Sequence, residues 1–180
     1  GFEDYQKNNA WIWQHQALVR ARVVAGDGAV AKKFRRVRHE VLTRERDPLL
    51  LQKEVREMRE RMRDNLSRES AGWFDLKQGR GGIADIEFMV QFGVLRWAHQ
   101  APDLTDFTDN IRLLAGLAAH GFFNAQECRI LSDAYRAYRA EVHRLSLQER
   151  PARVDTARLS GAREAVRGIW RKYLETDGSK

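Results

Sequence analysis

The sequence predicts an all-α protein, a bundle of about six to seven helices with one short extended Gly-rich segment between the third and fourth helices. Three observations support this prediction. Only 13 glycines and 3 prolines occur among 180 residues, while Ala, Leu and Arg are abundant. Apolar residues recur at steps of three and four, and capping residues stand where these runs begin. Because 43% of the residues are hydrophobic, residues 1–180 are expected to form a single domain around one core.

Three helices are expected before residue 67. The first has an apolar face and should end at Gly26, because glycine commonly terminates helices. That face comprises Trp11, Ile12, His15, Leu18, Val19 and Val23. Asp27 is expected to cap a second helix that ends near Arg44, and Asp47 with Pro48 marks the start of the third. The apolar stripe of the third helix comprises Leu51, Val55, Met58, Met62 and Leu66.

The helical pattern breaks over residues 67–82, the predicted Gly-rich loop, in which Trp73–Lys77 could form a short strand. The stretch Ile83–His99 is apolar nearly all round, which predicts a buried central helix. Asp109–His120 is expected to form a short helix that ends at Gly121.

The last part of the chain predicts two more helices. Asn124 and Glu127 have the spacing of a capping box, in which each side chain bonds the other residue's backbone, at the start of a long helix. Ser160 is expected to cap a final helix that continues through Trp170 to Leu174.

Charge and cysteine content limit the class of protein. The chain carries 32 Lys+Arg and 25 Asp+Glu, a net charge of +7, which could suit nucleic acid. However, the net charge of residues 67–123 is −2, and no exposed aromatic residues are expected among the basic ones, so a nucleic-acid module is disfavoured.

The single cysteine, Cys128, cannot form an internal disulfide. No secretory signal or apolar run of membrane-spanning length occurs, which predicts a cytoplasmic protein without membrane contact.

The Gly-rich loop holds the main candidate site. Glycines before a helix let its free N–H groups approach an anion, and the helix dipole favours a phosphate there. Lys77, Arg80, Gly81 and Gly82 are therefore candidates for phosphate binding. The alternative is that these glycines only permit tight packing.

Two carboxylates follow the loop. On a strand, Asp85 and Glu87 would point to the same side and could share a divalent metal ion. On a helix they diverge by about 200°. The length of the apolar run favours the helix, so we expect Asp85 to accept backbone N–H groups, Glu87 to form a buried salt bridge, and neither to bind metal.

Residues of the first helix are weaker candidates. His15 lies on the apolar face and is expected to be a hydrogen-bonded core residue rather than a ligand. Trp11 and Trp13 could stack on a base, but core packing is expected for Trp11. Arg20 and Arg22 could reach toward a nucleotide.

The run Phe-Asp-Leu-Lys at 74–77, followed by Gly-Gly-Ile-Ala-Asp-Ile-Glu-Phe at 81–88, resembles a signature of the bacterial glutamine synthetase adenylyltransferase/adenylyl-removing enzymes. It is also related to a motif of PII uridylyltransferases. Residues 4–22, 95–99, 108–112 and 145–149 are similar to the adenylylating half of the first family. The resemblance covers residues 2–175.

The resemblance implies a helical domain that follows a nucleotidyltransferase-fold domain, which would lie upstream of Gly1 and carry an Asp-x-Asp pair for Mg²⁺. The full enzyme would transfer AMP from ATP to a tyrosine of glutamine synthetase, under control of the PII signalling protein and glutamine. Within this chain the resemblance implies no catalytic residue, no metal ligand and no tightly bound ATP. Asp85, Glu87 and His15 would support the site. An alternative is a scaffold that docks glutamine synthetase or PII without nucleotide contact.

Overall fold

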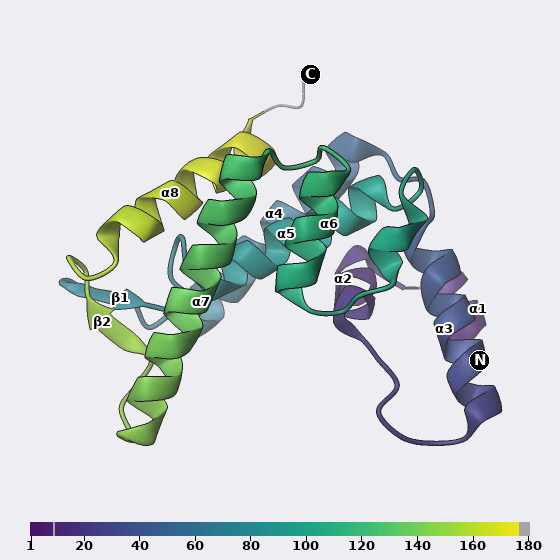
Figure 1. Ribbon diagram of the computed structural model, residues 1–180, viewed down its shortest axis with the longest axis horizontal. Coiled ribbons are helices and arrows are strands. Elements are labelled where there is room, and N and C mark those ends of the chain that lie inside the picture. Colours follow the sequence, from purple (N-terminus) through teal and green to yellow (C-terminus); the bar gives the residue numbers. More distant parts are fainter. Residues whose placement is uncertain (9, 177–180) are drawn as a thin grey trace.

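The computed structural model describes residues 1–8 and 10–176, and the predicted all-α fold is confirmed in them (Figure 1). Eight α-helices occur in this part of the chain: α1 (Phe2–Asn8), α2 (Ile12–Arg20), α3 (Gly28–Leu42), α4 (Pro48–Leu66), α5 (Ile83–Trp97), α6 (Asn110–Ala119), α7 (Ala125–Leu147) and α8 (Ser160–Trp170). Smaller elements are the 3-10 turn η1 (Pro102–Thr105), the π-helical turn η2 (Arg171–Glu175) and the strands β1 (Trp73–Asp75) and β2 (Arg153–Asp155). The count exceeds six to seven because we did not expect α1.

Helix α5 is the centre of the bundle, as its apolar sequence predicts. Eleven of its 15 residues are buried. It contacts α2, α4, α6, α7 and α8, and Figure 1 shows it behind α6 and α7 in the middle of the molecule. A helix surrounded in this way needs apolar side chains on nearly every face, which explains why its sequence lacks a polar side.

The predicted N-caps of α3, α4 and α7 are confirmed. Asp27 accepts the N–H groups of Ala29 and Val30, and Asp47 accepts that of Leu50. The capping box is also present, because the Asn124 side chain accepts the N–H of Glu127 and the Glu127 side chain accepts that of Asn124. These contacts fix the starts of α3, α4 and α7 through residues no more than three apart.

The predictions for the first helix were wrong in two respects. Helix α2 ends at Arg20 instead of Gly26, because Ala21 has an extended backbone with ψ 133°. Val23 therefore lies outside the helix and is exposed. Trp11, expected in the core, is 71% exposed, because it occupies the N-cap position of α2 where the chain enters from solvent.

The start of the last helix also differs from the prediction. Leu159, with φ +61°, occupies the N-cap position. Ser160 is instead the first residue of the helix, and its side chain makes no capping hydrogen bond. The helix does continue past Trp170, where the π-helical turn η2 carries the chain to Glu175. The positive φ of Leu159 turns the chain from the strand segment into α8.

The strand considered for residues 73–77 exists in shorter form as β1. It pairs antiparallel with β2, so that Phe74 lies opposite Val154, and both side chains are buried. The N–H of Leu76 extends the pairing by donating to the carbonyl of Ala152 at 3.0 Å. The partner strand β2 was not predicted, and it ties the Gly-rich loop to the segment before α8.

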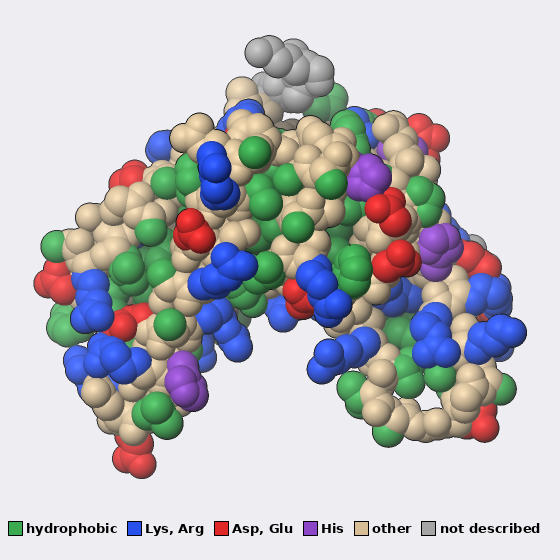
Figure 2. All heavy atoms as spheres, viewed as in Figure 1, with side chains coloured by type: hydrophobic (Ala, Val, Ile, Leu, Met, Phe, Trp, Pro, Cys, Tyr) green, Lys and Arg blue, Asp and Glu red, His purple; other side chains and the backbone are tan. Residues whose placement is uncertain are grey.

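The space-filling view shows a hollow in the lower edge of the molecule, bordered by Lys and Arg side chains (Figure 2). Its two sides are the part that contains α7 with the β1–β2 pair and the part that contains α3, as the same view of the ribbon shows (Figure 1). The exposed segment 22–27, which begins with Arg22, runs beside it. In the described residues, no helix is both long and apolar enough to cross a membrane.

Candidate functional site

The Gly-rich loop is a compact structure organised by Asp75. This carboxylate is buried and accepts the N–H groups of Lys77 at 2.9 Å, Gln78 at 3.0 Å and Arg68 at 3.0 Å. The Asp75 carbonyl in turn accepts the N–H of Gly79 at 2.9 Å. The backbone of the loop is therefore held from within, while the Lys77 side chain projects into solvent.

The N–H groups at the start of α5 already have acceptors inside the chain. Gly81 donates to Asp85 Oδ2 at 2.7 Å, Gly82 to the Gly79 carbonyl at 2.9 Å, and Ile83 to the Leu76 carbonyl at 2.9 Å. A phosphate contact in this conformation would have to come from the side chains of Lys77 and Arg80 rather than from these backbone donors.

The glycines themselves are required for close packing. Gly81 has φ +80°, and a Cβ there would stand 2.6 Å from the carbonyl oxygen of Arg163. A Cβ on Gly82 would stand 2.8 Å from the carbonyl oxygen of Leu76. A larger residue at Gly81 would force the loop away from α8, and one at Gly82 would meet carbonyls of the loop itself, so the tight-packing interpretation of these glycines has direct geometric support.

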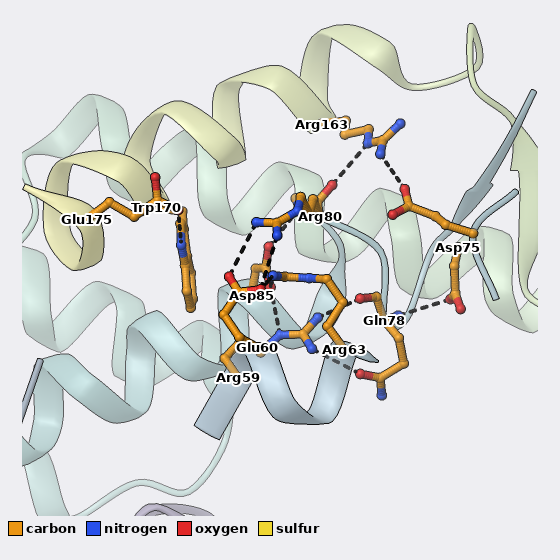
Figure 3. A network of polar contacts seen from close by, with 12 residues as sticks. Arg59, Glu60, Arg63, Asp75, Gln78, Arg80, Asp85, Arg163, Trp170 and Glu175 are labelled. Atoms are coloured by element: carbon orange, nitrogen blue, oxygen red, sulfur yellow. Dashed lines mark hydrogen bonds and ion pairs between the residues drawn. The ribbon is translucent and has the colours of Figure 1, made fainter. Parts of the chain in front are cut away.

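Asp85 sits between two arginines of α4 (Figure 3). Its Oδ1 atom accepts from Arg59 Nε at 2.7 Å and from Arg63 Nη2 at 2.9 Å, and both arginine side chains are buried. Arg59 also donates to the carbonyl of Gln78 at 2.7 Å, which joins the loop to the same network. Burial lowers the pKa of Arg59, and the charge of Asp85 opposes that shift. Asp85 thus accepts a backbone N–H, as expected, and is also neutralised by two cations.

Glu87 points to a different set of partners, as expected for a helix. Its carboxylate accepts from Arg20 of α2, from Asn110 Nδ2 at 3.3 Å and from the Tyr135 hydroxyl at 3.4 Å. It therefore links α5 to α2, α6 and α7. The side chain is 23% exposed, so the salt bridge is only partly buried. Across the described ranges, no group of three or more His, Cys, Asp or Glu side chains is arranged to hold a metal ion.

Lys77 and Arg80, the two basic candidates in the loop, differ in their surroundings. Arg80 is paired with Glu60, which Arg63 also contacts. Burial alone would raise the pKa of Glu60, but the bonds and charges of Arg63 and Arg80 outweigh burial and lower it. Lys77 is exposed, and among the described residues its ammonium has no hydrogen-bond or ion-pair partner. Lys77 is consequently free to meet a ligand, as is the exposed Arg68 at the start of the loop, whose guanidinium also has no hydrogen-bond or ion-pair partner in the described residues.

His15 is buried, and its Nε2 lies 3.0 Å from the carbonyl oxygen of Gln6. Its Nδ1 lies 3.4 Å from Arg46. Burial lowers the pKa of His15, which favours the neutral ring. These contacts agree with the expectation of a hydrogen-bonded core histidine.

The structure therefore separates the candidates. Arg80, Gly81 and Asp85 belong to one network around the loop, with Gly82 and the unpaired Lys77 beside it, whereas Arg20 and Glu87 form another between α2, α5, α6 and α7. Sequence reasoning missed Arg59 and Arg63. The only local signal was that both continue the four-residue spacing of Leu51 and Val55, which places charged residues on an inward face.

A family model described as GlnD PII-uridylyltransferase matches residues 50–159, which include the Gly-rich loop, the Asp85 network and helices α4 to α7. The chain belongs to this family of nucleotidyltransferase-related proteins. A second model, described as Glutamate-ammonia ligase adenylyltransferase, matches residues 1–37.

A relative in Nitrosococcus oceani is described as a bifunctional glutamine synthetase adenylyltransferase/adenylyl-removing enzyme. It is 52% identical to this chain over 179 residues, which cover 99% of the chain and 18% of the relative. The chain thus spans less than a fifth of the length of this relative. The resemblance found in the sequence is confirmed by this match.

Proposed function

We propose that this chain is a helical part of a glutamine synthetase adenylyltransferase/adenylyl-removing enzyme. There it would support transfer of AMP from ATP to a tyrosine of glutamine synthetase and so regulate nitrogen assimilation. The observation that carries the proposal is the 52% identity over 179 residues to a bifunctional enzyme of that description. The match of the uridylyltransferase family model across the loop supports a nucleotidyl-transfer role.

In this reaction the chain would supply positively charged side chains that bind phosphate, rather than ligands for a metal ion. Transfer of a nucleotidyl group needs carboxylates for Mg²⁺ and cations that hold the phosphates in line with the attacking oxygen. Asp85 fits poorly as a metal ligand, because Arg59 and Arg63 already neutralise it. The Mg²⁺ ligands would belong to a nucleotidyltransferase domain elsewhere in the polypeptide.

Lys77 is the first candidate for contact with the ATP phosphates, because it is exposed and unpaired on a loop whose backbone Asp75 holds fixed. Arg80 would bind the phosphates beside Lys77, and to do so it would give up one of its hydrogen bonds to Glu60. Arg20 and Arg22, which lie at and after the end of α2, could reach the substrate from the other network.

A second candidate function is docking of glutamine synthetase or PII without nucleotide contact. The exposed Trp11 and Trp13, at the start of α2, favour it, since exposed aromatic side chains are common at protein interfaces. The two functions are compatible, because docking would use α2 and catalytic support would use the loop.

A chimera would test the main proposal. The matching 179 residues of the Nitrosococcus oceani relative would be replaced by this chain, and labelled AMP incorporated into glutamine synthetase would be measured. We expect substantial incorporation. A folded chimera that incorporates no label, beside an active parent enzyme, would refute the assignment.

Within the active chimera, Lys77→Ala is expected to reduce the rate of incorporation about tenfold or more, the scale of a lost charge-assisted contact. Lys32→Ala is the matched control, because Lys32 is also an exposed and unpaired lysine but lies on α3. Equal rates in the two variants would remove Lys77 from the site. Pull-down of glutamine synthetase and PII by the 180-residue chain alone would measure docking separately.

A further inference from the structure

A second site lies beside the Asp85 network, on the side that faces α8. A cavity of about 220 Å³ separates the end of α4 and the start of α5 from the turn that joins α8 to η2. It is lined by Arg63, Arg80, Asp85, Arg167, Trp170, Arg171 and Glu175. Figure 3 shows Trp170 and Glu175 on one side, facing Asp85 and Arg80 on the other. Four arginines and two carboxylates thus surround one small space.

Both carboxylates of the lining are already engaged. Asp85 accepts from Arg59, Arg63 and the Gly81 N–H. Glu175 accepts from the Trp170 indole N–H at 3.0 Å. Their charge is therefore directed toward donors within the protein, which weakens their repulsion of an anion inside the cavity.

The arginines, in contrast, retain unused donors. In the described part of the chain Arg171 has no hydrogen-bond or ion-pair partner for its side chain. Arg167 uses only Nη1, which donates to Glu164 at 2.7 Å. A guanidinium carries five N–H donors in a planar fork, so both residues can still bind a ligand with two bonds each.

Arg63 adds a buried positive charge to the wall of the cavity. Its side chain is 7% exposed, and Nη1 and Nη2 are bonded to Glu60 and Asp85. Its Nε is buried and has no acceptor. The charge of Arg63 nevertheless stands at the wall of the cavity, where it favours an anion.

The wall that carries Trp170 and Arg171 is rigidly placed. The turn η2 has π-helical hydrogen bonding, which is rare and is often found at functional sites. Gln52 of α4 donates to the Tyr173 carbonyl at 2.8 Å, and Leu174 is fully buried. These contacts hold the π-helical turn η2 against α4, and they keep Arg171, its first residue, at the cavity.

We propose that this cavity is a binding site for a phosphate group, either inorganic phosphate or the phosphate of a small monoester, held by Arg167 and Arg171 beside the buried charge of Arg63. The volume is below the range of about 300–1,000 Å³ typical for organic ligands, which suits a phosphate group better than a whole nucleotide. The oxygens of a tetrahedral anion match several converging guanidinium groups. The site stands independently of the proposed function, because it requires neither Lys77 nor an active enzyme.

Calorimetric titration of the 180-residue chain with inorganic phosphate, at constant ionic strength set by sodium chloride, tests the site. We expect saturable binding at one site per chain. The double variant Arg167→Gln/Arg171→Gln should bind at least tenfold more weakly, because it removes the unused donors without altering Asp85 or its partners. The matched control is Arg136→Gln/Arg139→Gln, which removes the same charge from exposed positions on α7. Circular dichroism would verify that both variants fold.

Two further measurements locate the site and identify the source of the phosphate. The indole N–H resonance of Trp170 should shift on addition of phosphate, while that of the distant, exposed Trp11 should not. Adenosine monophosphate, titrated in the same way, distinguishes a monoester from the free ion. Binding of either ligand that is lost in the Arg167/Arg171 variant supports the site.

Three results would overturn the proposal: no saturable binding of either ligand, equal weakening by the α7 control, or binding that the Arg167/Arg171 variant retains. Lys77→Ala should leave phosphate binding unchanged. Loss of binding in that variant alone would assign the anion to the Gly-rich loop instead. Failure of this site would therefore be separate from failure of the chimera.

Discussion

Replacement of Asp85 by asparagine tests how much the buried network contributes to the stability of the bundle. Asp85 serves three donors: Arg59 and Arg63 on Oδ1 and the Gly81 N–H on Oδ2. Asparagine has one acceptor oxygen. If that oxygen faces the two arginines, its NH₂ group faces the Gly81 N–H, so that one donor opposes another.

The magnitude follows from the burial of the charges. The Arg59 side chain is 0% exposed and would retain Gln78 and at most the neutral amide oxygen of the new residue, while Arg63 keeps Glu60. Removal of one partner from a buried ion pair costs about 3–5 kcal/mol, because a charge is left buried and uncompensated. At about 2–4 °C per kcal/mol for a domain of this size, Asp85→Asn should lower Tm by roughly 6–20 °C.

Urea unfolding followed by circular dichroism would measure the loss in the free energy of unfolding. Glu87→Gln is the matched control on the same helix and should cost less than about 1 kcal/mol, because its salt bridge with Arg20 is partly exposed. Asp85→Asn combined with Arg59→Met should recover part of the loss, since the uncompensated cation is then gone. A loss below about 1 kcal/mol for Asp85→Asn would refute the view that this pair secures the loop.

Two other predictions concern single positions. Gly81→Ala should lower the free energy of unfolding by about 2 kcal/mol or more, because φ is +80° and the new Cβ would meet the Arg163 carbonyl. The control is Gly161→Ala in the same urea assay. It should be neutral or stabilising, because the space around Gly161 is open. Burial lowers the pKa of His15, so the unfolded chain binds a proton at this ring more readily than the folded chain. The contribution of neutral His15 to the free energy of unfolding is therefore fully present above about pH 6.5 and falls as the pH drops below that value. Urea midpoints at pH 7.5 and 5.5 should therefore differ less in His15→Gln than in the wild type, and an equal difference would contradict the assigned environment.

Features that depend on nearby residues were predictable from the sequence. The caps Asp27, Asp47 and Asn124 lie within three residues of the N–H groups that they bind, so the spacing alone identifies them. The central helix could be predicted because its apolar residues cover nearly every face over 15 positions.

Features that depend on distant residues were not predictable in this way. Helical spacing continues through Val23 although the helix ends at Arg20, because periodicity does not report whether a neighbouring element covers the residue. The Arg59–Asp85 pair joins residues 26 positions apart, and the partner of β1 lies beyond three more helices. The same limit applies to the phosphate cavity, since its lining comes from α4, the loop, α5, α8 and η2.

The pairing of β1 with β2 has a consequence for the order in which the chain can acquire its structure. Phe74 and Val154 are 80 residues apart, and Arg163, further on, packs over the Phe74 ring at 4.4 Å and donates to the carbonyl of Arg80 at 3.0 Å. Helices α4 and α5 can form from local contacts as they leave the ribosome. The Gly-rich loop between them acquires its full set of contacts only after residue 163 has emerged, so during synthesis it is the last part of the central region to become protected from proteases and hydrogen exchange.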